Sequence, residues 1–139
     1  MKKFFALVCV AAFVFGGAAF AEPIKFPNGL TIDVAPGWSY EGIDDSVILF
    51  SENMSCAIYI TVIDAEGMSA KDAAAAMSQG INGSEPQEVE EGTYFYTFMN
   101  EHGVESRVFA GVERGKLKVV SITGDHPDVD DIINSIIEE

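Results

Sequence analysis

The strands predicted in the second half of the chain carry apolar residues on both faces, and this feature limits the folds available to it. A strand with one face in water alternates apolar with polar residues, because successive side chains point to opposite faces. Over residues 93–101, both alternating sets are apolar instead, so other elements must cover both faces of the sheet. The two sets are Tyr94, Tyr96 and Phe98 on one side, and Phe95 and Met99 on the other.

Turn signals divide the chain into short extended segments. Glycine-containing turns separate the last four of them, which predicts an antiparallel meander. The N-terminal segment, residues 22–29, is punctuated by two prolines and ends in a turn signal. The predicted strands are 30–35, 38–42, 46–51, 56–64, 87–91, 93–101, 104–113 and 116–123.

Two stretches change to a helical period. Ser69 and Asp72 have the spacing of a capping box, and the alanines that follow predict a short helix over 70–79. Near the C-terminus, apolar residues recur at helical spacing and predict a buried amphipathic helix over 127–138. These apolar residues are Val129, Ile132, Ile133, Ile136 and Ile137. The predicted fold class is α+β, an antiparallel sheet flanked by helices in an α/β/α sandwich.

The first 21 residues have the features of a secretory signal peptide. Lys2 and Lys3 precede an apolar run that ends in two glycines and an Ala-x-Ala cleavage motif. We expect cleavage after Ala21, a single domain over 22–139, and a periplasmic or secreted location without membrane insertion. The alternative is an uncleaved anchor, because residues 4–21 are just long enough to span a bilayer.

The charge of the chain excludes one class of partner. Signal cleavage removes two of the 8 basic residues and none of the 22 acidic ones, so the formal net charge moves from −14 to −16. Nucleic-acid binding depends on neutralising phosphates with lysine and arginine, which this surface cannot do. Anionic lipid headgroups are disfavoured for the same reason. Soluble partners that are basic or that bring cations are favoured.

Cys56 is the one cysteine of the expected mature chain, so no internal disulfide can form. It alternates in register with Ile58, Ile60 and Val62, which indicates a small buried apolar residue. A thiol enzyme would need Cys56 beside His102 or His126, with its thiolate stabilised. Neither histidine lies in a recognisable motif, and no nucleophile elbow or phosphate-binding loop is present, so a hydrolase is the least favoured class.

Asp125, His126 and Asp128 are the candidate metal ligands. They lie in the densest cluster of such side chains, residues 125–131, and a divalent cation is the one cofactor considered. The spacing does not match an EF-hand loop. The simpler interpretation is a solvated acidic turn at the start of a helix.

Four aromatic residues are candidates for a partner-binding surface, because aromatic side chains dominate binding hot spots. They are Trp38, Tyr40, Tyr94 and Tyr96. The alternative is that strand aromatics pack in the core. For Trp38, which follows a proline–glycine corner, the alternative is an anchor that packs the first hairpin onto the rest of the domain.

The order of these elements resembles the PsbP-like superfamily, which includes bacterial DcrB-type periplasmic proteins and Ran-binding Mog-type proteins. The residues that carry the resemblance are Leu30 to Ala35 running into Pro36-Gly37-Trp38, the helix start Met68-Ser69-Ala70, the aromatic strand at Tyr94, and the closing Ile133-Asn134-Ser135-Ile136.

The resemblance implies an antiparallel sheet between helices and a non-enzymatic accessory or binding role, and it carries over no catalytic residue. The basic surface with which plant members dock to photosystem II is absent here. We therefore expect an exported, non-enzymatic binding or accessory protein with a protein partner or small ligand in the cell envelope. The alternative is a metal- or small-ligand-binding protein that uses the turn from Asp125 to Asp131.

Overall fold

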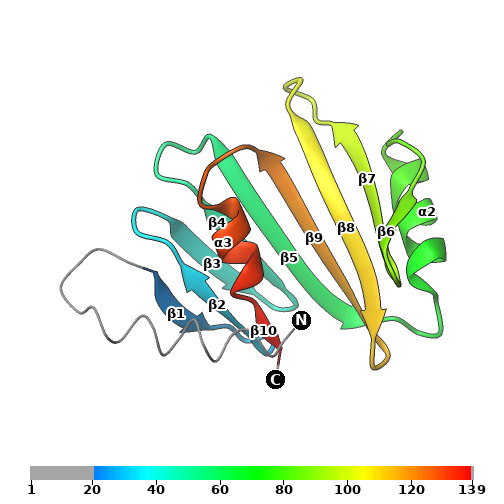
Figure 1. The fold of residues 1–139 in the computed structure, drawn as a ribbon, viewed down its shortest axis with the longest axis horizontal. Coiled ribbons are helices and arrows are strands. Elements are labelled where there is room, and N and C mark those ends of the chain that lie inside the picture. The colour runs from blue at the N-terminus through cyan, green and yellow to red at the C-terminus, as the bar shows by residue number, and fades with distance from the viewer. Residues whose placement is uncertain (1–20, 139) are drawn as a thin grey trace.

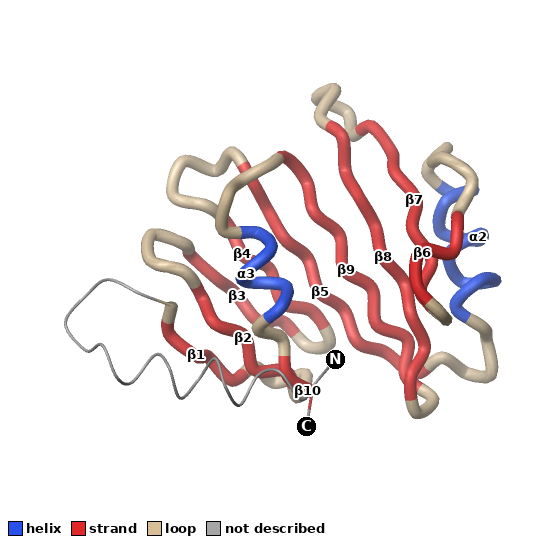
Figure 2. The backbone as a smooth tube through the Cα atoms, in the orientation of Figure 1, coloured by secondary structure: helices blue, strands red, loops and turns tan. Residues whose placement is uncertain are grey.

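The computed structural model describes residues 21–138, so residues 1–20 of the predicted signal peptide lie outside the described residues and the signal peptide remains a prediction. Figures 1 and 2 show one long sheet with a smaller sheet and two helices packed on it. The elements are β1 (Glu22–Lys25), β2 (Leu30–Val34), β3 (Ser39–Ile43), β4 (Ser46–Phe50), β5 (Cys56–Asp64), α2 (Ala70–Gly80), β6 (Gln87–Glu90), β7 (Thr93–Met99), β8 (Glu105–Glu113), β9 (Lys116–Gly124), α3 (Val129–Asn134) and β10 (Ile137–Glu138).

The long sheet has seven strands in the order β3-β4-β5-β9-β8-β7-β6, and every neighbouring pair is antiparallel. The predicted meander of the second half is therefore confirmed. Its last strand, β9, pairs along its whole length with β5, with Ile58 opposite Ile122 and Ile60 opposite Val120. This pairing joins the two halves of the chain in one sheet.

The two helices lie on opposite faces and at opposite ends of the long sheet (Figure 1). One face, here called the α3 face, carries Ile58, Ile60 and Val120, and α3 and the small sheet cover it over β4, β5 and β9. The other face, here called the α2 face, carries Val108 and Ala110 beneath the alanines of α2. The predicted α/β/α arrangement is confirmed, with each helix covering only part of its face.

The helix predicted over 70–79 is present as Ala70–Gly80 and begins as the sequence indicates. Ser69 is its N-cap, and the Ser69 hydroxyl accepts a hydrogen bond from the Asp72 amide at 3.1 Å. Ala73 and Ala74 are buried against the sheet. Their small side chains let the helix backbone approach β7 and β8 closely.

The helix predicted over 127–138 is wrong in length. It runs only from Val129 to Asn134, and the chain then continues as β10, which pairs with β2. Ser135 accounts for the change: its hydroxyl donates to the Ile132 carbonyl at 2.7 Å and accepts from the Asp33 amide of β2 at 2.9 Å. The open edge of β2 supplies backbone partners that a further helical turn would forgo.

The N-terminal segment contains a strand that the sequence analysis did not predict. β1 pairs with β2, placing β2 in the middle of a three-stranded sheet in the order β1-β2-β10. Pro23 fits this position because β1 is an edge strand, where a missing backbone donor is tolerated. Leu30 and Ile32 of β2 are fully buried between this sheet and the long one.

Gly124 ends β9 at a place where no side chain fits. It lies opposite Cys56 with a φ of +81°, in the left-handed region that glycine adopts without strain. A Cβ at this position would also collide with the Ser55 carbonyl. The end of the β5–β9 pairing, and hence the start of the turn that leads to α3, depends on this glycine.

We predict that Gly124→Ala lowers the free energy of unfolding more than Gly92→Ala. Gly92 has the same φ of +81° but open space around it, so its substitution carries only the backbone strain of about 1–2 kcal/mol. Gly124→Ala adds the collision with Ser55, for a further cost of about 1–3 kcal/mol. Denaturant unfolding of both variants measures the difference, and equal losses would contradict this account.

Candidate functional site

The turn after β9 brings together residues that the sequence analysis assigned to two different sites. The Trp38 indole Nε1 donates a hydrogen bond to Asp128 Oδ2 at 3.1 Å. The Trp38 and His126 rings pack edge to face, with their centroids 5.1 Å apart. Trp38 is buried in the core of the α3 face. It therefore fastens the start of β3 to the turn before α3, in keeping with the interpretation of Trp38 as an anchor.

The candidate metal ligands are engaged in the turn's own hydrogen bonds. The Asp128 amide donates to His126 Nδ1 at 3.1 Å, and the His126 amide donates to Asp125 Oδ1 at 3.0 Å. Asp128 occupies the N-cap of α3 but makes no side-chain capping bond. Its carboxylate receives the Trp38 indole instead. Within residues 21–138 no three His, Cys, Asp or Glu side chains are grouped to hold a metal ion, so the metal site stays a prediction.

An open recess lies beside this turn, with a volume of about 390 Å³. Its charged lining combines the Arg107 guanidinium with the carboxylates of Glu105 and Asp125. Sequence reasoning did not single out Arg107, which shares its strand with the charged residues Glu105 and Glu113. The remaining lining residues are Val104 and Gly124.

Cys56 is buried, as predicted, with 1% of its surface exposed. Burial raises the pKa of its thiol above the ordinary value of 9.0, and the negative charge of Asp125 adds to this, while the positive charge of Arg107 opposes it. A catalytic cysteine needs the opposite change, because the thiolate is the nucleophile. The surroundings of Cys56 therefore favour an unreactive thiol.

The four candidate aromatic residues do not form one surface. Trp38 and Tyr96 are buried in the separate cores of the two faces. Burial also raises the pKa of the Tyr96 hydroxyl. Tyr94 is half-buried near α2, and Tyr40 is the exposed member of the set, with its ring edge to face against Phe26 at 5.5 Å. A role of these residues in partner binding stays a prediction.

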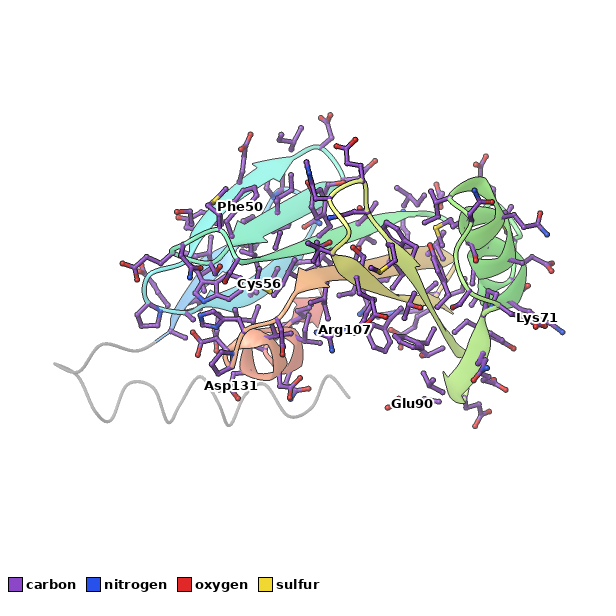
Figure 3. All side chains as sticks on the ribbon, turned by 90° about the horizontal axis from the view of Figure 1, so that it is seen from above. Phe50, Cys56, Lys71, Glu90, Arg107 and Asp131 are labelled. Atoms are coloured by element: carbon purple, nitrogen blue, oxygen red, sulfur yellow. The ribbon has the colours of Figure 1, made fainter. Side chains whose placement is uncertain are left out.

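A different group of apolar side chains is exposed on the α2 face, over β3, β4 and β5. In register, Ile48 lies opposite Tyr59, and Tyr59 lies opposite Ser121, which places them on the α2 face. The helix α2 covers β7 and β8 and leaves this end of the face bare; Figure 3 shows Phe50 on the side of the sheet away from α3. We call this group the β3–β5 strip; its members are Ile43, Ile48, Phe50, Tyr59 and Ile63.

The exposure of the strip is high for large apolar residues. Ile43 is 49% exposed, Tyr59 45% and Ile63 39%, while Ile48 and Phe50 are half-buried. The alternation in 56–63 predicted that Cys56, Ile58, Ile60 and Val62 share one face of a strand, and the first three are buried in the core. It did not predict a bare surface, because the position of α2 over β7 and β8 depends on tertiary packing.

The strands that carry the strip are uniformly acidic. Residues 39–64 include five carboxylates and no lysine, arginine or histidine. Glu41 lies on the strip's own face, directly opposite Ile48 in the register of β3 and β4. The others lie in the adjoining turns and at the end of β5, at Asp44, Asp45, Glu52 and Asp64.

We predict a favourable coupling between Trp38 and Asp128. In a double-mutant cycle of Trp38→Phe and Asp128→Ala, each single change removes the 3.1 Å hydrogen bond, so the double variant loses less than the sum of the two. We expect a coupling of about 1 kcal/mol, since Asp128 is only partly buried. Additive losses in the free energy of unfolding would show that this bond adds no stability.

We predict that Cys56 reacts slowly with iodoacetamide in the folded protein and rapidly in denaturant. The measurement uses a Cys9→Ser chain, so that Cys56 is the one thiol present. An alkylation rate in the folded protein close to the rate in denaturant would contradict the assignment of Cys56 as a buried thiol.

The same thiol should make stability depend on pH. Because the unfolded thiol ionises near pH 9.0 and the folded one at higher pH, the free energy of unfolding should fall as the pH rises above that value. The Cys56→Ala variant should lose the part of this pH-dependent decrease in stability that comes from the thiol.

No helix in the described part of the chain has the length and apolar character needed to cross a membrane. Comparison of the sequence with protein-family models gives no match, and comparison with curated proteins also gives none.

Solved structures do show the fold. A protein of Bacteroides thetaiotaomicron VPI-5482 matches with a TM-score of 0.55 and 12% identity over 88% of this chain; the match spans 49% of that protein, about half its length. Cyanobacterial PsbP (CyanoP) from Synechocystis sp. PCC 6803 matches with a TM-score of 0.51 and 13% identity, over 89% of this chain and 95% of that one. The chain therefore has a PsbP-like fold.

Proposed function

We propose that this protein is a non-enzymatic binding or accessory protein of the cell envelope, and that it holds a partner protein on the β3–β5 strip. The observation that carries the proposal is the exposure of Ile43, Tyr59 and Ile63 on one bare half of the α2 face. Exposed apolar side chains grouped on one face mark interaction sites, because leaving them in water costs free energy that a partner would recover.

The chemistry of the described residues supports a binding role over catalysis. The one thiol in the described part of the chain, Cys56, is buried with a raised pKa. The Asp128 oxygen that lies 3.6 Å from His126 Nδ1 receives the Trp38 indole, and His126 Nδ1 accepts the Asp128 amide, so both side chains hold the turn together. The likeness in fold to cyanobacterial PsbP is compatible with an accessory role, by analogy of fold.

The strip also has the composition of a protein-binding surface. A large aromatic side chain, Tyr59, lies among branched aliphatic ones, and its hydroxyl can keep a polar partner when the ring is covered. The surrounding carboxylates form a polar rim around an apolar centre, the usual arrangement in transient interfaces.

We predict that a photo-crosslinking amino acid at position 59 captures a recurrent partner in the cells that make the protein. Position 99 is the matched control, because Met99 is also exposed and apolar but lies on β7, outside the strip. Crosslinked products are identified by mass spectrometry. When Ile63→Ser is added, the yield of crosslinked partner at position 59 should fall. The yield of nonspecific crosslinked products at position 99 should stay unchanged.

A pattern of products shared by positions 59 and 99 would contradict the proposal, as would the absence of any protein crosslinked at 59. Circular dichroism of each variant shows that the fold is kept, which the partial exposure of Tyr59 and Ile63 makes the expected result.

A further inference from the structure

We propose that the partner presents a basic amphipathic α-helix, which lies across the β3–β5 strip beside α2. This inference rests on the proposed function and adds the chemistry of the partner. Two properties of the strip carry it, its charge and its spread over three strands.

The charge of the strip requires a basic partner. The strands and turns of residues 39–64 hold five carboxylates and no basic side chain, and one of the five, Asp64, is paired with Lys116 of β9 at 3.6 Å. Glu41 lies on the face that the partner would cover. A partner that brought carboxylates would meet like charges at a partly desolvated interface, where repulsion is strong. Lysine and arginine side chains at the rim would instead speed association and fix the orientation of the partner.

A second copy of this chain is disfavoured by the same charges. In a symmetric dimer built on this strip, each copy would place its own Glu41 and neighbouring carboxylates against those of the other. Nothing basic in residues 39–64 could compensate for them.

The spread of the strip over three strands favours a helix over a single added strand. A peptide that added to the open edge of β3 would pair with its backbone and lie beside Ile43, far from Ile63 on β5. The strip runs across β3, β4 and β5 instead of along one edge, with Tyr59 opposite Ile48 in the middle. A helix laid on the face can cover all three strands.

The protein already packs one helix on this face. The buried side of α2 lies on β7 and β8, in a core that also includes Leu117 of β9. Leu117 pairs with Ile63 of the strip, so the covered and bare parts of the face adjoin. A partner helix beside α2 would continue the same layer over β5, β4 and β3.

We predict that the full-length protein binds a synthetic helical peptide of leucine and lysine, with leucines recurring about every 3.6 residues. A peptide of identical composition in which leucine and lysine alternate, as on a strand, is the control for sheet-edge addition. The dissociation constant of each is measured by fluorescence anisotropy. The helical peptide should bind more tightly by about tenfold, and its binding should weaken as the ionic strength rises.

Matched variants separate the strip from general attraction to an acidic protein. Ile43→Ser should weaken binding of the helical peptide by about tenfold, and Val89→Ser should not change it. Val89 is 51% exposed, compared with 49% for Ile43, and it lies on the opposite edge strand of the same sheet among Glu88, Glu90 and Glu91. In the same way, Glu41→Gln should weaken binding and Glu90→Gln should not.

Any one of the following results would overturn the inference. Tighter binding of the alternating peptide points to strand addition at β3. A dimer lost with Ile43→Ser points to a second copy, and vesicle binding lost with Ile43→Ser points to lipid. Equal effects of Ile43→Ser and Val89→Ser mean that charge alone attracts the peptide.

The crosslinking experiment separates this inference from the proposed function. If position 59 captures a specific partner whose crosslinked segment is not a basic helix, the binding role stands and the helix proposal fails. If position 59 captures no specific partner, the proposed function fails.

Discussion

The pairing of β5 with β9 is the interaction on which the rest of the structure depends. These two nine-residue strands run antiparallel in register from Cys56 opposite Gly124 to Asp64 opposite Lys116. They join strands from the two halves of the chain, and each of the two cores includes residues from one face of β9. The register also sets the position of the turn after Gly124, and so the place where Asp128 meets Trp38.

The length of the long sheet explains why so much of it is bare. Two short helices and a three-stranded sheet cannot cover both faces of seven strands, and they lie at diagonally opposite ends. On the α3 face, the uncovered end includes Phe95 and Phe109, whose rings pack on each other with their centroids 4.8 Å apart. On the α2 face, the uncovered end is the β3–β5 strip, where Ile43, Tyr59 and Ile63 remain exposed. The two bare ends are therefore different surfaces with different chemistry.

Local patterns in the sequence predicted the elements whose partners lie nearby. The alternation that begins at Cys56 gave β5 its observed bounds, and the Ser69 cap gave the start of α2, because both depend on neighbouring residues. The C-terminal prediction failed at Ser135, where the competing partner is the distant backbone of Asp33. In the candidate site, the burial of Trp38 agrees with the alternative interpretation of this residue as an anchor, but its acceptor, 90 residues away at Asp128, is set by tertiary structure alone. The bare strip was hidden for the same reason, since exposure depends on where a distant helix packs.

The small sheet has a consequence for how the chain folds. β2 lies between β1, near the start of the described chain, and β10, at its end. Contacts between such distant segments require a large loop to close and so form slowly. The core beneath β2 cannot be sealed until β10 has been synthesised and has emerged from the ribosome. Until then, Leu30 and Ile32 remain accessible, so an incomplete chain would present a hydrophobic segment that a chaperone can recognise.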